Sequence, residues 1–150
     1  MRKPEFYSAV YWIIKNEKWE VLFQRRQNTW FRDWYFQLSS WHVEWEELMK
    51  DSLIREIKEE INIDIDEKDI ELVHISHRIT KNNRVYFDCY FDIKKYSWEL
   101  KNNEIDKCSE IKFVDIYNID DEEKHLFWYD LDVIRKIENW EKFSEMSLEK

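Results

Sequence analysis

The stretch that decides the fold of this protein is residues 41–63, which read WHVEWEELMKDSLIREIKEEINI. Its apolar residues recur at helical spacing and form one stripe, as expected of a helix that packs one face on a core. The stripe consists of Leu53, Ile54, Ile57 and Ile61. Acidic residues crowd the first turn, and Asn62 stands where a glycine or asparagine ends many helices. The pattern therefore predicts a helix over residues 46–61.

Three carboxylates stand on one face of this helix, because Glu56, Glu59 and Glu60 are spaced i, i+3 and i+4. Like charges at this spacing repel one another unless a cation sits between them. Hard oxygen ligands suit Mg²⁺ or Mn²⁺. The alternative is a solvated acidic face with Arg55 and Lys58 as helix partners, which is the usual meaning of a charge run.

The wider pattern favours the metal site. It begins at Trp41, continues after five residues with Glu47, and ends after seven more with REIKEEINI, residues 55–63. This resembles the Nudix box, Gly-x5-Glu-x7-Arg-Glu-U-x-Glu-Glu-x-Gly-U, in which U is apolar. Every polar position matches, and only the two glycines differ, being Trp41 and Asn62. The resemblance extends over nearly the whole chain, including the family's lead-in at residues 21–45.

The missing glycines are part of a larger anomaly, since the chain has no glycine and nine tryptophans. Glycine averages about 7% of residues in proteins. Tryptophan occupies positions where the resemblance, the predicted hairpin or a predicted loop calls for glycine: Trp19, Trp30, Trp34, Trp41, Trp45, Trp98 and Trp140. We interpret the chain as one in which UGA codons that encode glycine in the source organism are read as tryptophan. The alternative is a genuine or engineered tryptophan-rich variant.

The resemblance implies roles for individual residues. Glu56, Glu59 and Glu60 would bind the catalytic Mg²⁺, with Mn²⁺ as the alternative metal. In an alternative role, Glu56 would serve as the base or position the base. Glu47 would be a further ligand or orienting group, and Arg55 would pair with it. The resemblance also implies metal contact through the backbone carbonyl of Trp41 and a last acidic ligand from a late loop. For that ligand we expect Glu104, then Glu110, against the alternative of a solvated loop carboxylate.

The function implied is Mg²⁺-dependent hydrolysis of the diphosphate linkage of a nucleoside triphosphate or related nucleotide, by attack of water on phosphorus. Alternatives are a hydrolase of nucleotide sugars or dinucleotides and a non-catalytic nucleotide-binding module of the same fold. Substrate phosphates are expected to meet Arg25, Arg26 and Arg78, although surface arginines are common.

Composition limits the other classes of function. The 150 residues fit one domain, residues 1–150, and the net charge of −9 argues against binding a nucleic-acid backbone. No apolar run reaches membrane-spanning length, and the N-terminus lacks a signal-peptide core. Cys89 and Cys108 show no metal spacing, so a reduced, cytoplasmic setting is expected. The oligomeric state stays open.

The remaining periodicity predicts strands followed by a helix, twice over. Strands are expected at residues 6–14, 20–26, 35–38, 70–79, 84–93 and 110–115, and a second helix at 124–138. This order indicates an α/β (α+β) protein, and the resemblance specifies a Nudix-type α/β/α sandwich with a mixed sheet between helices.

Overall fold

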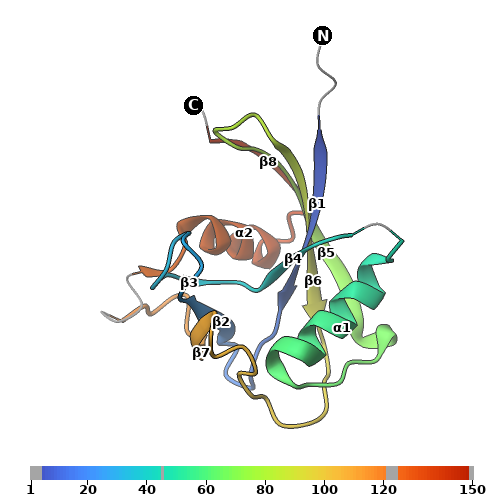
Figure 1. Ribbon diagram of the computed structural model, residues 1–150, viewed down its shortest axis with the longest axis vertical. Helices are drawn as coiled ribbons and strands as arrows, with labels where there is room; N and C mark the ends of the chain where they lie inside the picture. The colour runs from blue at the N-terminus through green and yellow to red at the C-terminus, as the bar shows by residue number, and fades with distance from the viewer. Residues whose placement is uncertain (1–4, 45, 121–124, 149–150) are drawn as a thin grey trace.

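A computed structural model describes residues 5–44, 46–120 and 125–148 (Figure 1). The described elements are strands, two α-helices and one 3-10 turn. In chain order they are β1 (Phe6–Ile13), β2 (Val21–Arg26), β3 (Phe36–Gln37), β4 (Ser40–His42), α1 (Met49–Ile61), η1 (Glu67–Asp69), β5 (Ile70–Ile79), β6 (Val85–Ile93), β7 (Cys108–Val114), α2 (Trp128–Glu138) and β8 (Phe143–Ser147).

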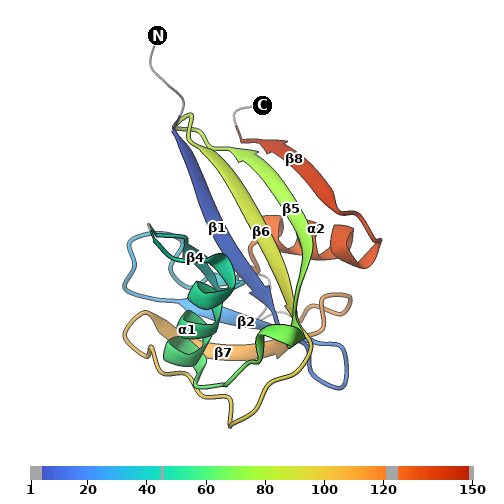
Figure 2. The ribbon, with the colours of Figure 1, turned by 90° about the vertical axis from the view of Figure 1, so that its right-hand side faces the viewer.

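The strands form two sheets. The larger one has the order β4-β1-β6-β5-β8 and is mixed, because β1 runs parallel to β6 and β5 parallel to β8 while the other pairs are antiparallel. Figure 2 shows β1, β6 and β5 side by side as its long central strands. The smaller sheet, β3-β2-β7, is antiparallel throughout.

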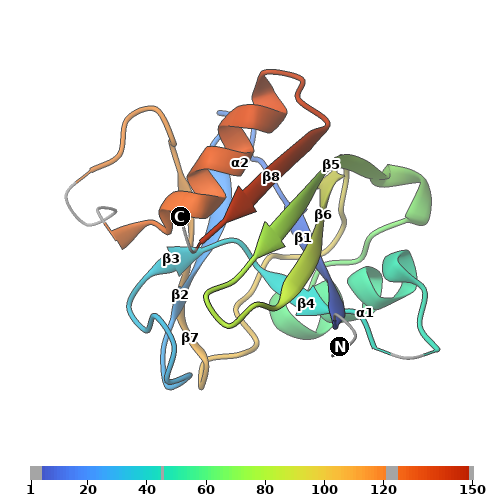
Figure 3. The same ribbon diagram turned by 90° about the horizontal axis from the view of Figure 1, so that it is seen from above.

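The two helices cover opposite faces of the large sheet, as the view in Figure 3 shows. Alternation along the central strands explains this arrangement, since successive side chains point to opposite faces. Val10 and Trp12 of β1 join the core beneath α1, whereas Ile13 and Tyr90 join the core beneath α2. The predicted α/β class with a mixed sheet between helices is therefore confirmed.

Two strands and one helix boundary differ from the prediction. Strands β4 and β8 were not expected, because they lie at the sheet's edges and are too short or too polar to show a clear alternation. Helix α1 begins at Met49 and not at residue 46, because Glu46 has a positive φ of 69° that a helix does not allow. The helix expected over 124–138 begins at Trp128; residues 121–124 lie outside the described part of the chain.

Within the described residues, no helix is both long and apolar enough to cross a membrane.

Candidate active site

Helix α1 carries the acidic face, and its packing determines how the carboxylates differ. Its apolar stripe of Leu53, Ile57 and Ile61 is fully buried against the large sheet. Glu56 and Glu60 lie close to that stripe and are buried, whereas 59% of the Glu59 side chain is exposed. Burial raises the pKa of the Glu56 carboxyl, although its contact with Arg55 opposes this shift. Two buried carboxylates on one helix turn make a strongly acidic and costly local environment.

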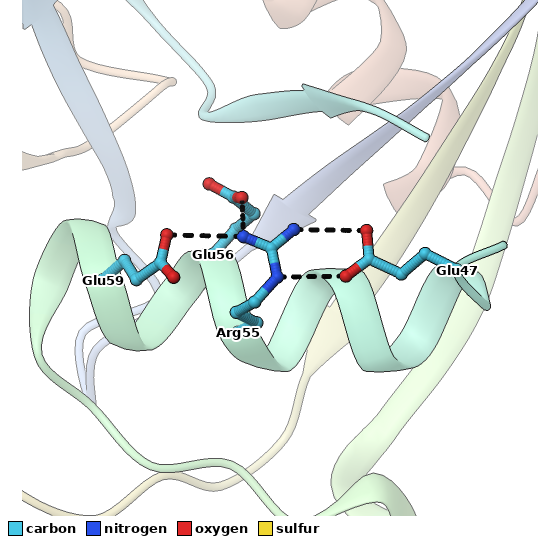
Figure 4. A network of polar contacts seen from close by, with 4 residues as sticks. All are labelled: Glu47, Arg55, Glu56 and Glu59. Atoms are coloured by element: carbon cyan, nitrogen blue, oxygen red, sulfur yellow. Dashed lines mark hydrogen bonds and ion pairs between the residues drawn. The ribbon is translucent and has the colours of Figure 1, made fainter. Parts of the chain in front are cut away.

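Arg55 stands at the centre of the acidic residues (Figure 4). Its Nε and one terminal nitrogen donate to the two oxygens of Glu47 at 3.0 and 3.1 Å, a bidentate pair. The other terminal nitrogen contacts Glu56 and donates to Glu59 over 3.4 Å. The hydrogen bond from Arg55 lowers the pKa of Glu47, and the same bond raises that of the arginine. The pairing of Arg55 with Glu47 therefore fixes the segment before α1 to the helix.

Glu60 faces the small sheet and meets a residue that the sequence did not single out. The Gln24 amide on β2 donates to Glu60 Oε2 at 3.0 Å. Burial raises the pKa of Glu60 to about 8; the bond from Gln24 opposes this, and the charges of Glu104 and Glu56 add to it. The sequence alone does not identify Gln24 as a site residue, because a single glutamine in a strand has no characteristic spacing. Only the tertiary contact between β2 and the last turn of α1 shows its place.

The loop between β6 and β7 brings Glu104 to the same place. Its backbone is tied to the end of α1, since Asn103 N–H donates to the Glu60 carbonyl at 2.8 Å and Lys101 N–H to the Ile61 carbonyl at 3.0 Å. Glu104 and Glu60 both line one open pocket. The other lining residues are Gln24, Arg25, Arg26, Thr29, Gln37, Ser40, Lys107 and Cys108.

The donor set suits a divalent cation, although Arg55 occupies oxygens of Glu47, Glu56 and Glu59. Among the described residues no three carboxylate, imidazole or thiol groups converge closely enough to enclose an ion. Burial raises the pKa values of Glu56 and Glu60, and the negative charge of Glu104 adds to both shifts. A hard cation between these oxygens would remove that repulsion. The residues present therefore fit Mg²⁺ or Mn²⁺ by their chemistry.

The three arginines expected to meet phosphates lie in two different places. Arg25 and Arg26 of β2 line the pocket beside Glu60. Arg78 lies on the α2 side of the large sheet, where it donates to both oxygens of the buried Asp88 at 2.7 and 3.1 Å. It does not line the pocket. The alternative acid Glu110 pairs with Arg25 over 3.5 Å.

Trp41 lies on β4 opposite Val10, and its ring lies 5.8 Å from the Arg55 guanidinium. Its indole Nε1 is buried without a hydrogen-bond partner among the described residues. An indole N–H normally finds such a partner when it is buried. The expected glycine position at Trp45 lies outside the described residues.

Five of the eight tryptophans in the described part of the chain adopt a positive φ, between 62° and 74°. They are Trp19, Trp30, Trp34, Trp98 and Trp140, and all are exposed. A side chain with a Cβ is strained in this region, which glycine enters freely. Trp12, by contrast, is buried in a regular strand. Backbone geometry thus calls for glycine at five positions, four of them in loops and one two residues after the end of α2.

Comparison with known proteins places the chain in a family. The NUDIX domain family matches residues 6–145. Comparison with curated proteins gives no significant match. Among solved structures, the MutT NUDIX hydrolase from Burkholderia pseudomallei superposes with a TM-score of 0.74 at 16% identity, covering 87% of this chain and 97% of that one. The MutT protein from Methanosarcina mazei Go1 gives 0.73 at 20% identity, covering 93% and 97%.

The chain therefore belongs to the NUDIX domain family and is a Nudix hydrolase. The structural likeness, at 20% identity or less, independently supports the fold. The family acts on diphosphate linkages of small nucleotide-related molecules and generally uses divalent metals.

Proposed function

We propose that this protein is a Mg²⁺-dependent pyrophosphohydrolase that cleaves the diphosphate linkage of a nucleoside triphosphate or related nucleotide. The observation that carries the proposal is that Glu60 of α1 and Glu104 line a pocket lined also by two arginines and a lysine. Acidic groups to hold a metal and cations to hold phosphate thus meet at one place. Mn²⁺ is the alternative metal.

In this mechanism, the oxygen of a water molecule attacks one phosphorus as the bridging P–O bond on the far side breaks. The leaving phosphate keeps the electron pair of that bond, and the proton of the water passes to a carboxylate. Glu56, Glu59 and Glu60 would hold the divalent ion, with Glu47, Glu104 and the Trp41 carbonyl as further candidate ligands. When bound, the ion would lower the pKa of water and neutralise phosphoryl charge.

Each protein group has a distinct task in the proposed reaction. Glu59 is open to solvent and is the carboxylate best placed to exchange a proton, with Glu56 as the alternative. Arg55 holds Glu47 in a fixed geometry through its two parallel hydrogen bonds. Arg25 and Arg26 are proposed to contact substrate phosphates. Arg78 is the weakest of the three, because Asp88 already occupies its guanidinium.

The test is release of phosphate or pyrophosphate from a panel of nucleoside triphosphates, nucleotide sugars and dinucleotides, with and without Mg²⁺. Turnover of triphosphates that depends on Mg²⁺ is the expected result. Preferential turnover of nucleotide sugars or dinucleotides would replace the proposed substrate by the alternative one. Nucleotide binding without turnover of any panel member, in a protein with glycine restored at the positive-φ tryptophans, would establish a binding module.

A reduced, cytoplasmic setting is part of this proposal. Cys89 and Cys108 are both unpaired and buried, as expected where disulfides do not form.

A further inference from the structure

Glu60 lies apart from the hydrogen bonds that join the other acidic residues of the candidate active site. Arg55 contacts three of their carboxylates, whereas Glu60 faces the small sheet. In the part of the chain that the structure describes, the Glu60 carboxylate accepts a single hydrogen bond, which the Gln24 amide donates to Oε2 at 3.0 Å. Because Glu60 is buried, little solvent is available to replace this bond. The orientation of the carboxylate therefore depends on Gln24.

Strand β2 fixes the position of Gln24. It is the central strand of the small sheet, and at Gln24 it pairs with Gln37 of β3 on one side and with Ile111 of β7 on the other. Leu22 stands two residues earlier, so its side chain points to the same face of the strand as that of Gln24. Leu22 is buried in the core that also contains Ile57 of α1. The strand therefore directs the Gln24 amide toward the last turn of this helix.

The chemistry of the two groups determines which atoms meet. A carboxylate that binds a metal is ionised and only accepts hydrogen bonds, so the Gln24 amide presents its nitrogen to Glu60. The bond engages Oε2, and Oε1 accepts no hydrogen bond within the described residues. Both side chains line the pocket that Glu104 also lines. The bond therefore restricts rotation of the carboxylate and leaves one oxygen for a cation.

We propose that Gln24 is a positioning residue of the metal site, whose amide holds the Glu60 carboxylate in the orientation that binds the divalent cation. The inference rests on the proposed function and deepens it, because it makes metal affinity depend on a strand residue outside the acidic helix. Groups that hydrogen-bond to a metal ligand orient it, and their loss typically lowers metal affinity about 10- to 100-fold. Gln24 thus orients Glu60 as Arg55 orients Glu47.

The experiment measures Mn²⁺ binding in the absence of nucleotide, from the EPR signal of free Mn²⁺. Gln24→Met removes the amide and keeps the length of the side chain, and it should weaken Mn²⁺ binding about tenfold or more. Gln37→Met is the matched control, because Gln37 lines the same pocket from the neighbouring strand and makes no hydrogen bond to Glu60 in the described chain. The Mn²⁺ affinity of this control should change less than about twofold.

A double-mutant cycle separates positioning of Glu60 from a general effect on folding. Glu60→Gln should itself weaken Mn²⁺ binding, because it removes a proposed ligand. In that background Gln24→Met should cause little further loss, since the carboxylate through which it acts is gone. In the nucleotide assay, Gln24→Met should raise the Mg²⁺ concentration that gives half-maximal turnover. The KM for the nucleotide at saturating Mg²⁺ should stay nearly unchanged, whereas a distorted pocket would alter it.

Equal Mn²⁺ affinity of Gln24→Met and the unmodified protein would overturn the inference. An equal loss in Gln37→Met, an additive loss in the double variant, or unchanged affinity in Glu60→Gln would overturn it as well. Failure of the proposed function is distinguishable, because Mn²⁺ binding would then still depend on Gln24 while no nucleotide is hydrolysed. Absence of Mn²⁺ binding to the unmodified protein would overturn both.

Discussion

Glu59 and Glu60 are neighbours in the sequence, but their surroundings are opposite. Glu60 is buried and receives a hydrogen bond from Gln24, whereas Glu59 is largely exposed and interacts with Arg55 over 3.4 Å. A substitution at Glu59 therefore removes an oxygen donor without leaving a cavity or an unpaired buried group. This separates loss of activity from loss of folding.

Glu59→Gln is expected to reduce turnover by about 10²-fold or more, since it removes a group proposed to hold the metal or accept a proton. The free energy of unfolding should change by less than about 0.5 kcal/mol, as for other exposed positions. Steady-state kinetics and urea denaturation measure the two quantities. Glu17→Gln, at an exposed carboxylate between β1 and β2, should leave both unchanged. Unaltered turnover in Glu59→Gln would refute its proposed role.

The positive φ of five tryptophans supports the proposal that they stand where glycine belongs. Trp140→Gly is expected to raise the free energy of unfolding by about 1 kcal/mol, because glycine enters the left-handed region without strain. Trp128→Gly, in the first turn of α2, should lower it by roughly 0.5–1 kcal/mol. Urea denaturation of both variants provides the comparison. Destabilisation by Trp140→Gly would contradict the strain argument, and TGG codons at Trp41 and Trp45 would contradict the recoding proposal.

Helix α2 is joined to the segment before β4 by a buried carboxylate. Asp130 in its first turn is fully buried and accepts a hydrogen bond from Leu38 N–H at 2.8 Å. Burial raises its pKa to about 7; the bond from Leu38 opposes this shift, Asp88 adds to it, and Arg78 and Arg32 also oppose it. The helix therefore carries a group that favours its neutral form when the protein is folded.

The stability of the protein should respond to this group between about pH 4 and 7. In the unfolded chain Asp130 ionises near pH 4, whereas in the folded protein its pKa is about 7. The contribution of Asp130 to the free energy of unfolding is therefore present at low pH and is lost as pH rises toward 7. Asp130→Asn keeps an acceptor for Leu38 N–H and cannot ionise. The free energy of unfolding of Asp130→Asn, measured with urea, should therefore increase relative to that of the unmodified protein as pH rises from 5 to 7. Parallel pH profiles would show that Asp130 does not titrate in this way.

The two sheets and α1 together bring acidic groups from distant parts of the chain to one place. Glu104 comes from the loop before β7, Glu47 from the segment before α1, and Glu56 and Glu60 from the helix itself. A cation bound among them, as proposed, would link these segments only in the folded protein. Such binding would therefore be coupled to global stability.

Mn²⁺ at a hundredfold excess over its Kd is expected to stabilise the folded protein by about 2.7 kcal/mol, since the unfolded chain does not preserve the site. The thermal midpoint should rise by several degrees and return after addition of EDTA. Glu56→Gln should reduce the rise, while Glu17→Gln, an exposed carboxylate between β1 and β2, should not. A midpoint that is independent of Mn²⁺ would argue against a metal site on α1.

The sequence by itself determined the helix over most of 46–61, the long strands, the family and the acidic face, because each depends on residue types at fixed spacing along one element. It also indicated that five tryptophans stand where glycine is expected, since turns restrict φ locally. These are Trp19, Trp30, Trp34, Trp98 and Trp140. Only the tertiary structure decided that Gln24 holds Glu60, that Lys107 shares its pocket, and that Arg78 lies elsewhere with Asp88. Those relations join elements far apart in the chain, and they depend on how sheets and helices pack, which no local spacing encodes.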